Sequence, residues 1–217
     1  MGVTTAVTDL FMIQNTGTGN TFQNIKFEND NTNAATIGAI GEGGQYASYV
    51  NCEFYNSTNL NSNTVAELVL NGDSAQFYNC TFGSIADAVV GNVVRPAVIT
   101  TAGAIATAYS GGVSRDVLFE GCQFWKNAGG TGTAMIKITS ANDLERNMEI
   151  KDCSFVANPL GSTPAVAIAS ATTLTKGFVN LTGSTNSVNC TKLATATGIF
   201  SSLPARVATA TIGIQTT

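Results

Sequence analysis

The side chains that could carry out acid–base chemistry in this chain are few, and most of them are carboxylates. The 217 residues include no histidine, which is the commonest general base, a frequent metal ligand and the usual partner of a nucleophilic Ser or Cys. Ser-His-Asp and Cys-His sites are therefore excluded within a single chain. Catalysis by Asp, Glu, Lys, Arg or Tyr stays open.

Glu120, Lys151 and Asp152 occupy neighbouring positions in successive copies of a short repeat, so we expect them to lie close together on one surface. Two carboxylates about 5 to 9 Å apart would suit the hydrolysis of a glycosidic bond. The alternative, which we favour, is that Glu120 and Lys151 form an ordinary charge pair between adjacent strands. Three further charged residues are expected near the same surface: Arg115, Asp116 and Glu53.

The elements that position these residues are defined by a six-residue pattern that recurs along the chain. It consists of an apolar residue, two spacers of which the second is small and usually polar, then Cys or Ile, a polar residue and Phe. The copies are 22–27, 49–54, 77–82, 119–124 and 150–155, with a degenerate sixth at 188–192. They recur every 27 to 42 residues, which is too sparse for a meander of hairpins and fits a coil with several strands per turn.

Alternation of apolar, polar and apolar residues predicts a strand with one buried face. Stacking of the copies in parallel sheets then predicts three ladders of like residues. The Cys/Ile ladder is Ile25, Cys52, Cys80, Cys122 and Cys153, with Cys190 in the degenerate copy. The Phe ladder is Phe27, Phe54, Phe82, Phe124 and Phe155. The corner ladder is Asn24, Asn51 and Asn79, followed by Gly121, Asp152 and Asn189.

A second strand is expected after most copies, because short apolar runs follow them at a similar offset. These runs are 35–40, 65–70, 97–100, 135–138 and 165–168. Gly- and Asn-rich stretches between the two strand families suit turns. Residues 141–147 are expected to form one turn of helix in a loop.

These features predict an all-β protein, a right-handed parallel β-helix of about six to eight coils over residues 1–170. Residues 171–217 are expected to cap the last coil or to add a strand to a neighbouring subunit, two alternatives that stay open. Over residues 9–170 the Asn-Cys-x-Phe pattern resembles the pectin-lyase-like β-helix superfamily. That superfamily includes lyases, hydrolases, adhesins and structural virion parts. If the chain were such an enzyme, the resemblance implies Glu120, Asp152, Lys151 and Arg115 as its catalytic residues.

Three other features have a structural and a functional interpretation. The regularly spaced Cys residues are expected to fill the core, because parallel Cβ atoms in a column lie too far apart for disulfides. The polar loop 28–33 could bind calcium, but its spacing matches neither an EF-hand loop nor a glycine-rich RTX nonapeptide, and a solvated corner is expected. Trp125 and Tyr55, at equivalent positions of two copies, form an outward aromatic patch that suits sugar stacking or, in our preference, a subunit interface.

Composition narrows the function further. Only 11% of the residues are charged, the net charge is −4, and the absence of a basic cluster predicts no nucleic-acid partner. No segment reads as a membrane span, a cofactor loop or a signal peptide, so synthesis in a host cytoplasm is expected. We therefore expect a non-enzymatic virion structural protein, a bacteriophage capsid decoration protein that forms homotrimers and contacts the capsid shell. The alternatives are a tail spike or fibre that binds or depolymerises host surface glycan, and a bacterial adhesin fragment.

Overall fold

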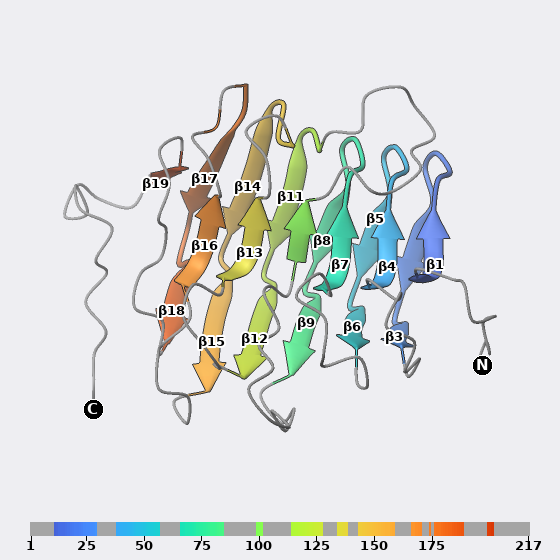
Figure 1. Cartoon of the computed structure of the whole chain (residues 1–217), viewed down its shortest axis with the longest axis horizontal. Coiled ribbons are helices and arrows are strands. Elements are labelled where there is room, and N and C mark those ends of the chain that lie inside the picture. Colours follow the sequence, from blue (N-terminus) through green and yellow to red (C-terminus); the bar gives the residue numbers. More distant parts are fainter. Residues whose placement is uncertain are drawn as a thin grey trace.

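The computed structural model describes the strands and corners of the repeat and leaves several connecting segments undescribed. The described residues are 11–29, 38–56, 66–84, 99–101, 114–127, 134–138, 143–158, 166–170, 174, 176–188 and 199–201. Within these ranges the regular secondary structure consists of β-strands alone. The strands stack along the longest axis of the molecule (Figure 1).

The strands form three parallel sheets, which the chain visits in turn. The first sheet contains β1 (Phe11–Asn15), β4 (Gly38–Glu42), β7 (Ala66–Leu70), β10 (Ile99–Thr101), β13 (Ala134–Ile138) and β16 (Val166–Ser170). The second contains β2 (Thr21–Gln23), β5 (Ser48–Val50), β8 (Gln76–Tyr78), β11 (Val117–Glu120), β14 (Asn147–Lys151), β17 (Phe178–Thr182) and β19 (Ile199–Ser201). The third contains β3 (Lys26–Asn29), β6 (Glu53–Asn56), β9 (Thr81–Ser84), β12 (Gln123–Asn127), β15 (Ser154–Asn158) and β18 (Asn186–Val188).

This topology confirms the prediction of an all-β solenoid with parallel strands. Each inner strand pairs with the equivalent strands of the preceding and following coils, and each end strand with one of them, so like residues lie above one another. The runs expected to form second strands correspond to β4, β7, β10, β13 and β16 of the first sheet. Beyond residue 170, β17 and β18 continue the second and third sheets, and residues 202–217 lie outside the described part of the chain.

Each copy of the six-residue pattern spans a sharp corner between the second and third sheets. The corner residue has a left-handed backbone in five successive copies, with φ of 55° at Asn24, 51° at Asn51, 51° at Asn79, 66° at Gly121 and 53° at Asp152. Asn, Asp and Gly tolerate this conformation best. The expected ladder of amides is present between Asn51 and Asn24, whose side chains hydrogen-bond over 3.3 Å. Asn189 lies outside the described residues.

A second left-handed corner, which the sequence analysis did not predict, precedes the strands of the second sheet. Its residues are Gly19, Tyr46, Ser74 and Asp116, with φ between 46° and 69°. Isolated bridges join the residues beside them from coil to coil. Left-handed residues thus flank the strands β2, β5, β8 and β11 of the second sheet at both ends.

The core contains two columns of aromatic rings that stack along the solenoid, together with aliphatic side chains of the first sheet. In the third sheet, neighbouring rings lie 4.6 to 5.2 Å apart; the members are Phe27, Phe54, Phe82, Phe124 and Phe155. In the second sheet the spacing is 4.8 Å, and the members are Phe22, Tyr49, Phe77 and Phe119. Rings of the two columns meet edge to face, an arrangement that aromatic quadrupoles favour. The predicted Phe ladder is confirmed.

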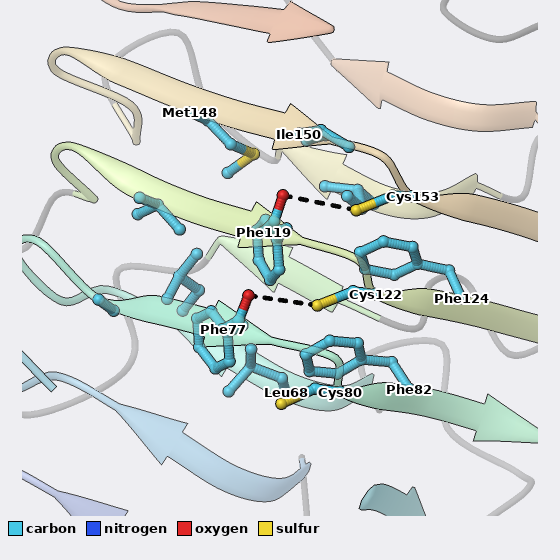
Figure 2. Packing of buried hydrophobic residues seen from close by; sticks show 14 of the residues in the cluster. Leu68, Phe77, Cys80, Phe82, Phe119, Cys122, Phe124, Met148, Ile150 and Cys153 are labelled. Carbon is cyan, nitrogen blue, oxygen red and sulfur yellow. Dashed lines mark hydrogen bonds between the residues drawn. The ribbon is translucent and has the colours of Figure 1, made fainter. Parts of the chain in front are cut away.

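The described cysteines form a buried column of free thiols, as predicted: Cys52, Cys80, Cys122 and Cys153. Each thiol donates to a backbone carbonyl of the preceding coil, as in the 3.3 Å contact from Cys122 Sγ to Phe77 O (Figure 2). Burial raises the pKa of the Cys122 thiol, which keeps it protonated as a donor. The column therefore links neighbouring coils. Cys190 lies outside the described residues.

Two expectations are wrong in detail. Ile25 was expected inside the solenoid, but 39% of its surface is exposed, because β2 and β3 are edge strands and no coil before them is described as covering this position. The helical turn expected at 141–147 is absent from its described part, 143–147. There Leu144 is buried and bridges to Ser114, and Asn147 begins β14.

Candidate functional site

The structure places Glu120 and Lys151 side by side on the outer face of the second sheet. They are the last residues of β11 and β14 and are Cα partners in the ladder. Lys151 Nζ lies 2.8 Å from Glu120 Oε1, and 42% and 37% of the two side chains are exposed. The hydrogen bond to Glu120 and its charge raise the pKa of Lys151. Both groups thus take part in one ion pair between neighbouring coils.

Asp152 follows Lys151 at the corner, where its carboxylate contacts the next coil. Asp152 Oδ1 accepts a hydrogen bond of 2.7 Å from the backbone N–H of Ser184. A side chain at Gly183 would collide with this carboxylate, and Gly183 itself has φ of 63°. The carboxylate of Asp152 therefore stabilises the path of the following turn.

Arg115 lies away from these residues, at the opposite end of β11 from Glu120. β11 itself spans about 10 Å from Val117 to Glu120, and the left-handed corner at Asp116 separates Arg115 from the start of this strand. Arg115 forms an ion pair with Glu145, and Asp116 pairs with Arg146 over 2.6 Å. The structure therefore brings Glu120, Lys151 and Asp152 together and does not bring Arg115 to them.

Glu53 also lies apart from that surface, because it belongs to β6 on the other side of the corner. Of the loop 28–33, only Glu28 and residue 29 are described, and Glu28 pairs with Lys26 over 2.8 Å. Among the described residues, no group of three His, Cys, Asp or Glu side chains could hold a metal ion. No helix in that part of the chain is long and apolar enough to cross a membrane.

A buried polar cluster, which the sequence analysis missed, lies inside the solenoid at the end of β4, a strand of the first sheet. The Glu42 carboxylate accepts hydrogen bonds from Tyr49 Oη, from Asn15 Nδ2 over 2.8 Å and from the backbone N–H of Gly44 over 2.7 Å. Burial raises the pKa of Glu42, while the three donors oppose this effect. Burial and the charge of Glu42 raise the pKa of Tyr49 as well, so its hydroxyl stays protonated.

The outer face of the third sheet carries a hollow between two aromatic side chains. Trp125 in β12 is the Cα partner of Gly83 in β9. Tyr55 in β6 lies one residue beyond Phe54, the partner of Phe82, so it flanks Gly83 on the other side. Tyr55 and Trp125 are thus two strands apart, with a residue that has no side chain between them.

The hollow has a volume of about 260 Å³ and polar as well as aromatic walls. It is lined by Lys26, Glu53, Phe54, Tyr55, Thr81, Gly83 and Trp125. The Lys26 ammonium lies 5.5 Å from the centroid of the Tyr55 ring, within the range of a cation–π contact. Its aromatic walls and mixed polarity make this open hollow a candidate binding site.

Sequence reasoning identified Trp125 and Tyr55 as an aromatic patch but missed the gap between them. The signal was present in the repeat, because the residue three positions after Cys is Tyr55, Gly83 and Trp125 in three successive copies. Side chains at that position point outward, as the alternation with Phe54, Phe82 and Phe124 requires. No family model, curated protein or solved structure matches this chain.

Proposed function

We propose that this chain is a non-enzymatic structural protein of a virus particle. In this proposal it is a bacteriophage capsid decoration protein that assembles as a homotrimer on the shell. We further propose that its solenoid is a right-handed β-helix of six to eight coils, of the pectin-lyase-like kind. Sheets of six or seven parallel strands support that number of coils, and the general right-handedness of parallel crossovers supports the hand.

The observation that carries the proposal is that the candidate acid–base side chains form contacts between neighbouring coils. Glu120 and Lys151 neutralise each other between coils, and Asp152 accepts a backbone hydrogen bond from the next turn. Arg115 is engaged with Glu145 at the far end of β11. A set of residues committed to contacts between coils suits a rigid particle component better than a hydrolytic centre.

Self-association is supported by a partly exposed apolar patch on the outer face of the second sheet. Val50, Tyr78 and Leu118 lie on the neighbouring strands β5, β8 and β11, and each is half-buried. The inward residues of these strands, among them Phe77 and Phe119, fill the core. Tyr78 is the Cα partner of Glu120, whose charge is paired with Lys151, and an apolar patch beside a neutralised ion pair favours side-by-side packing of identical subunits.

Sedimentation equilibrium of the purified chain tests the oligomer, and co-sedimentation with capsids of the virus that encodes it tests the decoration role. We expect a trimer that pellets with the capsids. Tyr78→Glu should shift the equilibrium toward monomer because it places a charge in the apolar patch. A stable monomer without affinity for the shell would overturn the proposal.

A second candidate function is a tail spike or fibre that binds polysaccharide, and the hollow between Tyr55 and Trp125 favours it. If that protein were also a depolymerase, Glu120→Gln would abolish release of reducing ends from host capsular polysaccharide. The structural proposal expects no release from either the wild type or the variant. Reducing-end assays with both proteins therefore separate the two functions.

A further inference from the structure

We propose that the hollow between Tyr55 and Trp125 binds one neutral pyranose ring of a glycan, with its two faces against the two aromatic rings. This inference goes beyond the proposed structural function and applies equally to a capsid protein and a tail protein. It rests on the spacing of the two aromatic residues, on Gly83 between them, and on the polar groups at the rim.

The spacing of Tyr55 and Trp125 suits an inserted ring. Adjacent strands lie about 4.8 Å apart, so residues two strands apart are separated by about 9.6 Å. A ring held between two aromatic faces needs about 7–8 Å between their planes, because carbon atoms make contact at about 3.5–4.0 Å on each side. Inside the solenoid, where every strand carries a ring, Phe54 and Phe82 stack at 4.6 Å and leave no space.

Gly83 keeps this space open on the strand between the aromatics. Its φ of 79° lies in the left-handed region, where a residue with a Cβ is strained. The equivalent positions in the neighbouring strands carry the large side chains of Tyr55 and Trp125. A glycine here therefore serves both the backbone conformation and the opening between the rings.

Residues on the next strands pack beside the two aromatic residues. The Lys26 ammonium lies over the Tyr55 ring, and Lys26 belongs to β3, on the side of β6 away from β9. Trp125 is the Cα partner of Val156 in β15, on the side of β12 away from β9. Each aromatic side chain is thus backed by the next strand, while Gly83 lies between the two.

The rim chemistry indicates a neutral, hydroxyl-rich ligand. Glu53 offers acceptors, Lys26 offers donors and Thr81 offers both, and all three line the hollow. The charge of Lys26 is paired with Glu28, so together with Glu53 the rim has no excess positive charge, which does not favour an acidic sugar. A pyranose combines apolar C–H faces with an equatorial rim of hydroxyl groups, and so matches aromatic walls with polar edges. The volume of about 260 Å³ suits a single ring.

Trp125 provides the readout, because it is the only tryptophan in the chain. Its fluorescence should be titrated with the methyl α-pyranosides of glucose, galactose and mannose. Sorbitol serves as an acyclic polyol control, and methyl α-glucuronide as a charged comparison. We expect a saturable change in emission with at least one of the neutral pyranosides. We expect none with sorbitol, and a weaker response to the glucuronide than to its glucose counterpart.

Variants with a retained fold connect the response to the hollow. Tyr55→Ala should weaken sugar binding by about tenfold, as the loss of one stacking contact implies, whereas Tyr55→Phe should retain it. Tyr78→Ala is the matched control, a half-buried tyrosine on the outer face of the second sheet, and it should bind sugar like the wild type. Thermal melts followed by circular dichroism verify that each variant is folded.

Three results would overturn the inference. The first is the absence of a saturable response to any of the three neutral pyranosides. The second is equal sugar affinity in Tyr55→Ala and the wild type. The third is Trp125 emission that changes with the protein concentration and not with the sugar concentration. The last result would assign the hollow to a subunit interface. The outcome is independent of the structural proposal. A trimer that does not bind sugar would refute only sugar binding in the hollow, and a monomer that binds sugar would refute only the trimeric assembly.

Discussion

The Tyr49 hydroxyl donates a hydrogen bond to the Glu42 carboxylate inside the solenoid. Tyr49 belongs to the aromatic column of the second sheet, where it stacks 4.8 Å from both Phe22 and Phe77. Glu42 ends β4 of the first sheet. This contact therefore joins the aromatic column to the carboxylate at the end of β4, and it holds the Tyr49 ring in its position in the column.

Glu42 should make stability depend on pH in a definite direction. Burial raises its pKa above the ordinary value of 4.5, so in the window above that value the unfolded chain ionises more readily than the folded one. The contribution of Glu42 to the free energy of unfolding should therefore fall as pH rises above 4.5, and level off above the folded pKa. Glu42→Gln should remove this dependence, as measured by urea unfolding at a series of pH values.

Glu42→Gln should also destabilise the protein at neutral pH. Three donors converge on the carboxylate, and the amide of Gln would turn an N–H₂ group toward one of them. The expected cost is about 1–3 kcal/mol. Glu53→Gln, at an exposed position, is the control and should leave both the stability and its pH dependence nearly unchanged. An identical pH profile for Glu42→Gln and the wild type would contradict the prediction.

The described cysteines should resist alkylation in the folded protein. At most 1% of the surface of each residue is exposed, so the reagent cannot reach the thiols. The reactive species is the thiolate; burial raises the pKa of Cys122, and although hydrogen bonding with Cys122 lowers the pKa of Cys80 and Cys153, their burial still protects them. Iodoacetamide followed by peptide mapping should modify Cys52, Cys80, Cys122 and Cys153 only after addition of denaturant. Native labelling of Cys122 at the rate seen in denaturant would show that the column opens.

Asn79 should be replaced by Gly with less loss of stability than by Ala. Its φ is 51°, and the left-handed conformation costs an ordinary L-residue about 1–2 kcal/mol. Thermal unfolding of Asn79→Ala and Asn79→Gly measures the difference. As a matched pair, Thr81→Ala and Thr81→Gly in β9 should rank in the opposite order, because glycine weakens a strand. The same ranking at both positions would refute the role of the corner.

The ion pair of Glu120 and Lys151 should contribute little to stability. The two side chains are about 40% exposed, so solvent and salt screen their attraction. Glu120→Gln should shift the melting temperature by less than about 2 °C. Because the pKa of Lys151 is raised, any stabilisation is present at neutral pH and is lost as pH rises through the folded pKa. A larger change in melting temperature at neutral pH would contradict this prediction.

The fold was accessible from the sequence because its information is local and repeated. Alternation within each copy assigns Phe54 and Phe82 to the inner face, and equal spacing from the corner places them above each other. Ile25 fits the same pattern but lies in an edge coil, and a repeat pattern does not reveal where the stack ends. The error at Ile25 therefore comes from its place in the stack and not from its residue type.

The sites were less accessible because they depend on partners that are distant in the sequence. Gly83 resembles a turn glycine until the register places it between Tyr55 and Trp125. Glu42 resembles the polar end of a strand, since only the three-dimensional path brings the Tyr49 hydroxyl to it. Glu120 and Lys151, by contrast, occupy equivalent positions of the repeat, and their charge pair was foreseen.

The register of the third sheet tolerates large differences in the length of the connecting chain. Glu53 and Thr81 are Cα partners 28 residues apart, and Thr81 and Gln123 are partners 42 residues apart. Closing the longer interval costs only about 0.4 kcal/mol more, since each doubling of a loop costs about 0.6 kcal/mol. Most of the extra length falls between β10 and β11, because Leu70 and Gln76 lie six residues apart and their partners Thr101 and Leu118 lie 17 apart. New sequence can therefore be inserted between β10 and β11 without altering the pairing of the coils. This gives evolution, or an engineer who displays a foreign peptide, a permissive position between the first and second sheets.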